Sequence, residues 1–161
     1  MKIFLDTEFT YLGGIEHDIK LISAGLVAED GSECYVELVG HYDESECSDF
    51  VHEAVLPHLK PEKHGLPAPE AAAKIKAWIE AFGEPVEIMT DSPGYDFGLL
   101  SDLLRDHDAW PANLPTATPR RVDPTNIDPG IERYFQYQPM AIRHHALWDA
   151  RALAAACREL S

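Results

Sequence analysis

The sequence predicts an α/β fold in which a mixed sheet begins with an antiparallel meander and carries flanking helices. Three observations predict it: apolar runs of strand length early in the chain, an Asp-Gly turn between two of them, and helical apolar spacing in later segments. The 161 residues are 45% apolar and 25% charged, which suits one domain, residues 1–161, with a substantial core.

The first three elements are expected to be strands. Residues 2–9 form an apolar run interrupted by two acidic residues, as in a buried strand whose far end turns polar. Residues 19–28 and 33–39 are two further apolar runs, and the turn between them at 29–32 contains an Asp-Gly pair. The three strands therefore form an antiparallel meander.

Helices and strands alternate after the meander. Apolar residues three and four apart predict the helices, Pro69 suits a helical first turn, and Gly83 ends one apolar pattern. Five prolines between positions 111 and 129 predict a loop-rich crossing. The expected elements are a helix at 48–59, a helix at 70–82, a strand at 86–90, a helix at 95–107, a short strand at 120–123, a short helix at 131–136 and a helix at 146–160.

The charge balance limits the partners of the chain. A net charge of −15 argues against holding long nucleic acid or an anionic membrane by bulk electrostatics, so an anionic substrate must be held locally. The first apolar run is too short for a signal-peptide core, and no run reaches membrane-spanning length, so we expect a cytoplasmic protein. Cys34, Cys47 and Cys157 contain no Cys-x-x-Cys pair and are expected to be reduced packing residues.

Asp6 and Glu8 are the first candidate functional residues. They are two residues apart on a predicted strand, so both side chains project from one face. Beside apolar neighbours the two carboxylates would repel each other unless a cation neutralised them, and hard oxygen ligands suit Mg²⁺ or Mn²⁺. The alternative is a strand that emerges into solvent at Asp6.

Two later segments carry further candidates. Asp96 lies at the start of a predicted helix, where an acidic side chain is commonly a cap, and Asp91 lies nearer the end of the preceding strand. Asp149 lies in the first turns of the last helix, and His144 or His145 just before it has a reference pKa suited to accepting a proton from water. Paired histidines in a loop are more often surface residues.

Together the three segments resemble the DEDD 3′-5′ exonucleases of the ribonuclease H-like fold. The first motif of that family is an apolar strand bearing Asp-x-Glu, and the second is an Asp followed by an aromatic residue at a helix start, here Asp96. The third motif of the histidine subclass, His-x-Ala-x-x-Asp-Ala, matches His144 to Ala150. The second motif lacks the usual His-Asn lead-in, which leaves Asp91 as an alternative to Asp96.

The resemblance implies a two-metal phosphodiesterase. Asp6, Glu8 and Asp149 would bind one Mg²⁺ or Mn²⁺ ion, Asp6 with Asp96 would bind the second, and His144 would be the general base, with His145 as the neighbour to test. The compact single-domain relatives imply a 3′-5′ exoribonuclease acting on the 3′ end of short or overhanging single-stranded RNA, with DNA as a secondary substrate, and a homodimer. A 3′-5′ exonuclease acting mainly on single-stranded DNA is the alternative. The residues implied to bind substrate are Thr7, Phe9, Thr10 and Leu12.

Other functions are less well supported by the sequence. An apolar strand ending in Asp-Thr-Glu is similar to the start of haloacid dehalogenase-type phosphatases, but Glu8 replaces their second Asp and no lysine follows Lys76. A binding module that keeps the fold without turnover is the other alternative, although all five expected catalytic side-chain types are present. The histidines with no metal-ligand spacing, which we expect at the surface, are His41, His52, His58 and His64.

Overall fold

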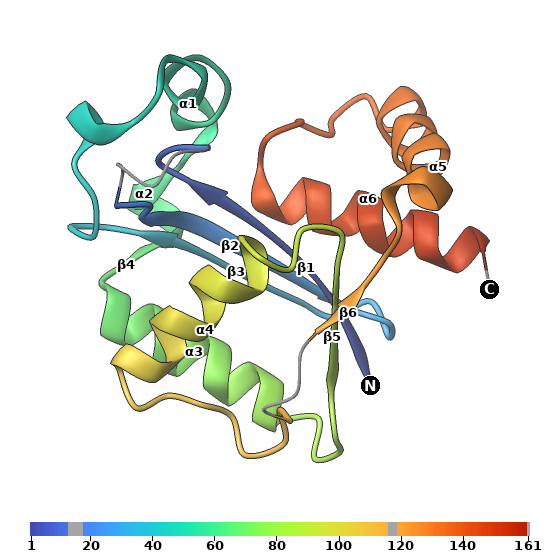
Figure 1. Cartoon of the computed structure of the whole chain (residues 1–161), viewed down its shortest axis with the longest axis horizontal. Coiled ribbons are helices and arrows are strands. Elements are labelled where there is room, and N and C mark those ends of the chain that lie inside the picture. The colour runs from blue at the N-terminus through green and yellow to red at the C-terminus, as the bar shows by residue number, and fades with distance from the viewer. Residues whose placement is uncertain (13–17, 116–118, 161) are drawn as a thin grey trace.

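A six-stranded sheet forms the centre of the computed structural model, which describes residues 1–12, 18–115 and 119–160. The strand order is β4-β3-β2-β1-β5-β6 (Figure 1). The strands are β1 (Lys2–Phe9), β2 (Leu21–Ala28), β3 (Glu33–Leu38), β4 (Gly65–Leu66), β5 (Glu87–Thr90) and β6 (Arg120–Arg121).

Strand pairing confirms the predicted mixed sheet. β1 pairs antiparallel with β2, and β2 pairs antiparallel with β3, as the Asp-Gly turn predicted. β5 pairs parallel with β1, β6 pairs parallel with β5, and β4 pairs parallel with β3. β1 therefore lies inside the sheet, with an antiparallel neighbour on one side and a parallel neighbour on the other.

Helices cover both faces of the sheet (Figure 1). α3 and α4 share one apolar core with the sheet, and α5 and α6 share a second core on the opposite face. The helices are α1 (Asp49–Ala54), α2 (Pro61–His64), α3 (Ala68–Glu80), α4 (Asp96–Asp106), α5 (Pro124–Tyr137) and α6 (Ala146–Glu159), with short 3-10 helices η1 (Glu44–Glu46) and η2 (Leu56–His58). No helix in the described part of the chain is both long and apolar enough to cross a membrane.

Side-chain alternation along β1 separates the two cores. Ile3 and Leu5 belong to the core with α3 and α4, whereas Phe4 belongs to the core with α5 and α6. Because successive side chains of a strand point to opposite faces, Asp6 and Glu8 follow Phe4 onto the face of α5 and α6. The polar end of β1 therefore lies under the start of α6.

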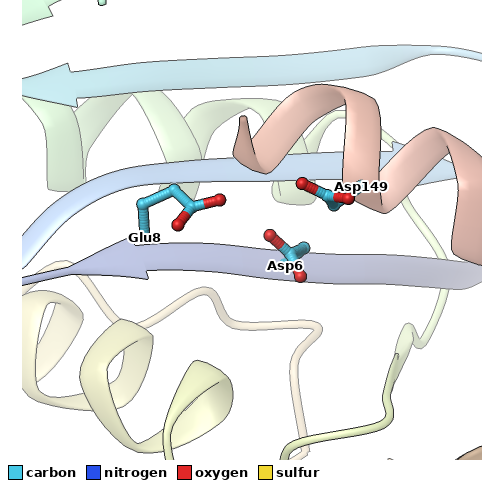
Figure 2. A group of neighbouring side chains, drawn as sticks. All are labelled: Asp6, Glu8 and Asp149. Carbon is cyan, nitrogen blue, oxygen red and sulfur yellow. The ribbon is translucent and has the colours of Figure 1, made fainter. Parts of the chain in front are cut away.

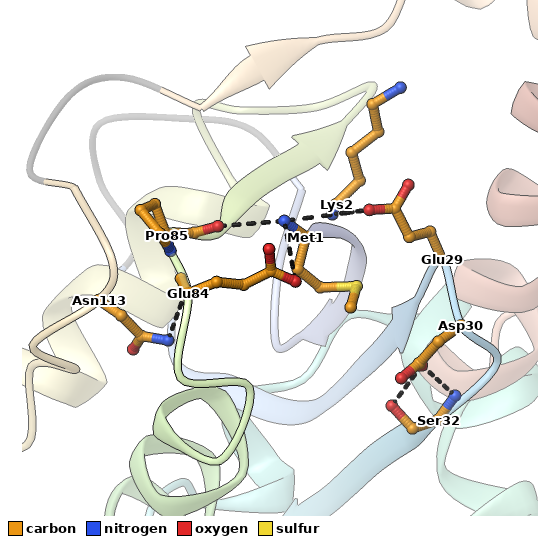
Figure 3. Close-up of polar contacts among 8 residues, drawn as sticks. All are labelled: Met1, Lys2, Glu29, Asp30, Ser32, Glu84, Pro85 and Asn113. Carbon is orange, nitrogen blue, oxygen red and sulfur yellow. Dashed lines mark hydrogen bonds and ion pairs between the residues drawn. The ribbon is translucent and has the colours of Figure 1, made fainter.

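The other end of β1 is anchored by polar contacts (Figure 3). The Met1 amino group donates to the Pro85 carbonyl oxygen at 3.1 Å and forms ion pairs with Glu29 and Glu84 at 3.9 and 3.7 Å. The Lys2 backbone N–H donates to Glu29 Oε1 at 2.9 Å. These contacts tie the start of β1 to the β2–β3 turn and to the segment before β5, which fixes the strand far from its polar end.

The helix expected at 48–59 is shorter than the sequence predicts. α1 ends at Ala54, and η2 follows at Leu56. Pro57 lacks a backbone N–H and its ring clashes with the carbonyl one turn earlier, so a continuous α-helix through it is disfavoured. Ser48 caps the start of α1, because its Oγ accepts a hydrogen bond from the Val51 N–H at 3.3 Å.

The Pro-rich crossing contains more helix than predicted. α5 runs for 14 residues from Pro124 to Tyr137, whereas the expected helix covered 131–136. Pro124 occupies the first turn, where its missing N–H costs no hydrogen bond, and Asp123 caps the helix. Pro129 lies inside the helix, but burial of Ile127 in the second core offsets its effect. The short elements α2 and β4 were not predicted.

Candidate active site

Three carboxylates meet where the polar end of β1 faces α6. One oxygen each from Asp6, Glu8 and Asp149 lies within 4.8 Å of the others. Figure 2 shows the two β1 side chains pointing toward Asp149, which comes from the first turn of α6. Side chains more than 140 positions apart in sequence are thus brought to one point by the packing of α6 on β1 and β2.

Asp96 lies beside this group at the start of α4. Its side chain is buried, with only 3% of its surface exposed, and its two oxygens accept hydrogen bonds from Thr7 Oγ1 at 2.8 Å and Thr90 Oγ1 at 2.6 Å. The two threonines fix the orientation of the carboxylate from β1 and β5. Asp91 also lines the same pocket, so the structure brings both alternatives for the second motif to the site.

The start of α6 fixes Asp149. The Asp149 backbone N–H donates to the His145 carbonyl oxygen at 3.0 Å, and Asp149 Oδ2 accepts from the His145 N–H at 3.0 Å. α6 comes close to the sheet at this point because position 25 on β2 is a glycine. A Cβ added there would lie 2.4 Å from the backbone carbonyl group of Ala146.

Burial and mutual repulsion raise the pKa of every carboxyl group in the cluster. Burial, reinforced by neighbouring carboxylates, raises the pKa of Asp6 well above its ordinary value and that of Glu8 to about 8. Burial also raises the pKa values of Asp96 and Asp149 to about 6, against the opposing effect of their hydrogen bonds. Within the described ranges, no Lys or Arg forms an ion pair with any of the four.

This donor set fits a divalent cation. Hard, anionic oxygens that are partly buried, close together and without a basic ion-pair partner are the ligands that Mg²⁺ and Mn²⁺ prefer. In residues 1–12, 18–115 and 119–160, no other group of three metal-ligating side chains has this spacing, so none includes His41, His52, His58 or His64.

Cation-free protein is expected to lose stability as the pH rises from about 4 to 8. A carboxyl group whose pKa is raised by folding ionises at lower pH in the unfolded chain than in the folded protein. The loss of stability therefore begins near the unfolded values of about 4 and, for Glu8, continues to its folded value of about 8. Melting temperatures measured across this range with EDTA, and again with Mn²⁺, test it. Mn²⁺ should raise the melting temperature more at pH 8 than at pH 5, and equal shifts at both would contradict the expectation.

A pocket of about 720 Å³ opens onto the carboxylates. Of the residues expected to bind substrate, Thr7, Phe9 and Leu12 line it, and Phe9 stacks on Tyr95 with ring centroids 5.1 Å apart. The Thr7 hydroxyl is directed to Asp96. Thr10 lies outside the lining, because it is buried and its hydroxyl accepts from the Lys20 N–H at 3.0 Å.

The two adjacent histidines have different surroundings. His144 lies in the loop before α6 with a φ of 58° and lines the pocket with Asp149. Partial burial and nearby Arg143 hold its pKa below the usual value. His145 turns away and stacks on Tyr35, with ring centroids 4.8 Å apart and an interplanar angle of 24°. Burial lowers its pKa to about 4.

The sequence did not single out Phe50 as a pocket residue. Its helical spacing suggested a buried position, yet 54% of its surface is exposed and it lines the pocket. Its ring meets that of His144 edge-on at 4.9 Å. The short α1 puts Phe50 in its first turn, beside the capping Ser48, which also lines the pocket. No sequence signal distinguished this position from the buried face of a longer helix.

Comparisons with known proteins bear on the fold and on the family of the chain. No protein-family model matches the chain. The solved structure of S. pombe Pop2p in its Mg²⁺- and Mn²⁺-bound form matches with a TM-score of 0.61 and 16% identity, over 99% of this chain and 82% of that one. This likeness confirms a ribonuclease H-like mixed sheet with flanking helices.

Curated relatives give the family. Two proteins, from two strains of Mycobacterium tuberculosis, are each named 3′-5′ exoribonuclease. Each is 33% identical to this chain over 156 residues, which cover 94% of this chain and 88% of the relative. The expectation of a 3′-5′ exonuclease is thereby confirmed at the level of the family. The chain belongs to the family of these 3′-5′ exoribonucleases.

Proposed function

We propose that the chain hydrolyses phosphodiester bonds at the 3′ end of short or overhanging single-stranded RNA, by a two-metal mechanism of the histidine subclass. The observation that carries the proposal is the cluster of partly buried carboxylates that forms no ion pair with a basic side chain in the described structure and opens onto a pocket. The exoribonuclease name of the mycobacterial relatives supports RNA as the substrate, and the Mg²⁺ and Mn²⁺ in Pop2p support the choice of cation.

The four carboxylates have assigned roles in this proposal. Asp6, Glu8 and Asp149 would hold one cation, and Asp6 with Asp96 would hold the second. The bound cations supply positive charge that stabilises the phosphate oxygens and lowers the pKa of the attacking water. The hydrogen bonds from Thr7 and Thr90 hold Asp96 in a fixed orientation, which reduces the reorganisation needed when substrate binds.

His144 is the proposed general base. Its lowered pKa leaves the imidazole neutral at physiological pH, so a ring nitrogen can accept the proton of the attacking water. His144 lines the pocket together with Asp149, whereas the His145 ring is stacked on Tyr35. The position of His144 in the loop before α6 supports this choice between the two histidines.

The pocket walls suit a single-stranded 3′ end. Phe9, Leu12 and Phe50 present apolar surface beside the carboxylates, and stacking of a base on an aromatic ring tolerates any sequence. Such local contacts, together with bound cations, allow a chain with a net charge of −15 to hold a polyanion. Activity on DNA and a homodimer stay predictions.

The test uses purified full-length protein and short RNA labelled at one end. With Mn²⁺ or Mg²⁺, RNA labelled at the 5′ end should give a ladder of shortening products, and RNA labelled at the 3′ end should release its label in the first step. A chelator or the substitution Asp6→Ala should abolish both. Unchanged RNA in every cation would refute the proposal, and loss of the 5′ label first would reverse the polarity.

His144→Ala is expected to lower kcat by about 10²- to 10⁴-fold, the usual contribution of a positioned base. Binding of Mn²⁺, measured by calorimetry, should stay within about twofold of wild type because the carboxylates are unchanged. At saturating Mn²⁺ the loss of kcat in His145→Ala should be smaller. His52→Ala, on the exposed side of α1 outside the pocket, is the control. A larger loss for His145→Ala would identify His145 as the base.

Phe50→Ala is expected to raise the KM for RNA about tenfold, since stacking of a base on an aromatic ring contributes ~1–3 kcal/mol. The KM is measured with a short RNA at saturating Mn²⁺. Tyr137→Ala removes another exposed aromatic ring, at the end of α5 and outside the pocket, and should leave the KM unchanged. Equal values of KM for Phe50→Ala and wild type would exclude this contact.

A further inference from the structure

One row of residues across the sheet lies under the first turn of α6. Asp6 on β1 is paired with Gly25 on β2, and Gly25 is paired with Tyr35 on β3. Directly paired residues of antiparallel strands project to the same face. Asp6, Gly25 and Tyr35 therefore all lie on the face of the sheet that α6 covers. The carboxylate site occupies one end of the row, and Tyr35 occupies the other.

Gly25 lets the backbone of α6 contact the middle of the row. A Cβ at this position would lie 2.4 Å from the carbonyl carbon and oxygen of Ala146 and 2.5 Å from the nitrogen of Leu147. All three are backbone atoms, so no side-chain rotation can relieve the overlap. The first turn of α6 is therefore held directly against β2, and its lateral position depends on what lies on either side of the glycine.

Tyr35 provides a fixed surface on one side. The ring is buried, its hydroxyl donates to Glu37 Oε1 at 2.9 Å, and Glu37 itself is only 2% exposed. Both Glu37 oxygens also accept from the Lys60 backbone N–H, at 3.0 and 2.9 Å. The edge of the His64 ring packs against Tyr35, with centroids 5.2 Å apart. These contacts restrict rotation of the Tyr35 ring.

His145 connects this surface to the carboxylate site. Its ring stacks on Tyr35, and its backbone N–H donates to Asp149 Oδ2 at 3.0 Å. Its carbonyl oxygen accepts from the Asp149 N–H at 3.0 Å. The place of the His145 ring thus determines where its backbone lies, and the backbone determines the direction of the Asp149 carboxylate.

We propose that Tyr35 is a positioning residue for the proposed cation site: its ring holds His145, and the His145 backbone aims the Asp149 carboxylate at Asp6 and Glu8. This inference rests on the proposed function, and it assigns a role to a buried tyrosine that has no place in the pocket lining. Residues that orient metal ligands typically change metal affinity or activity 10- to 100-fold when they are replaced.

Mn²⁺ binding measured by calorimetry, without RNA, tests the proposal directly. Tyr35→Leu should raise the Kd for Mn²⁺ about tenfold, and it should lower kcat at limiting Mn²⁺ while leaving the KM for RNA unchanged at saturating Mn²⁺. Tyr35→Phe keeps the ring and should restore the Kd to within about threefold of wild type. Tyr42→Leu removes a half-buried tyrosine from an apolar cluster that contains no α6 residue, and it controls for loss of stability, because it should leave the Kd unchanged.

A second variant removes the same contact from the other side. His145→Ala keeps the backbone N–H but loses the ring stack, so it should also raise the Kd for Mn²⁺ about tenfold. Because both substitutions remove one contact, the Kd of the double variant Tyr35→Leu/His145→Ala should be no higher than that of either single variant. If Tyr35→Leu does not fold, the Kd of His145→Ala for Mn²⁺ tests the positioning role instead. Wild-type Kd values in the folded variants would overturn the positioning role alone, whereas absence of Mn²⁺ binding to wild-type protein would overturn the proposed function as well.

Discussion

Asp6→Asn is expected to abolish RNA degradation and, at the same time, to raise the melting temperature of the cation-free protein. The substitution removes an anionic ligand from the cluster, so we expect activity to fall about 10³-fold or more, as for a loss of several kcal/mol of transition-state stabilisation. It also removes a carboxyl group whose own pKa is raised by burial and by the neighbouring carboxylates, so the folded state no longer has to keep this group protonated or bear its charge. Relief of ~1–2 kcal/mol of this cost corresponds to a melting temperature about 2–8 °C higher at pH 8.

The opposite signs of the two effects make this prediction specific. A substitution that merely damages the fold lowers activity and stability together. Asp102→Asn, on the exposed side of α4, changes the net charge by the same amount and should leave both quantities near wild type. The melting temperature is measured in EDTA at pH 5 and pH 8, and the activity is measured by the RNA assay in Mn²⁺. A lower melting temperature for Asp6→Asn at pH 8 would contradict the repulsion on which the cation site is argued.

Gly25→Ala is expected to disable the site although position 25 binds neither cation nor substrate. A single methyl group would overlap the backbone at Ala146, so α6 must move away from β2 and carry Asp149 with it. A displacement of about 1 Å at a reacting centre can cost about 10²-fold in rate, and we expect a loss of at least this size. The Kd for Mn²⁺ should rise in parallel, because Asp149 would no longer face Asp6.

Gly98→Ala is the matched control for this substitution. Gly98 lies inside α4, and a Cβ there would meet no atom within 4 Å. Alanine favours a helix interior over glycine by roughly 0.5–1 kcal/mol, so Gly98→Ala should stabilise the protein and leave activity unchanged. Wild-type activity and Mn²⁺ affinity for Gly25→Ala would show that the close approach of α6 to β2 does not determine the geometry of the carboxylates.

Local patterns explain which elements the sequence could predict. β1, β2 and β3 are largely apolar runs, and an Asp-Gly turn joins β2 to β3. α6 has dense apolar spacing and high helix propensity, so residue type alone indicates the structure of these elements. α5 was underestimated because prolines disfavour helices locally, while its burial against α6 is a tertiary contact. The interruption between α1 and η2 at Pro57 was open to prediction, because proline acts on its own helix.

The sequence by itself determined the α/β class, the meander, and the order of the acidic segments that resemble an exonuclease family. Only the tertiary structure decided that α6 rests on Gly25, that His144 faces the pocket while His145 stacks on Tyr35, and that Phe50 lines the pocket wall. The physical reason is the distance along the chain between the residues that interact. Secondary structure follows from neighbours a few positions apart, whereas a site built from Asp6, Asp96 and Asp149 depends on which backbones can approach each other across the sheet.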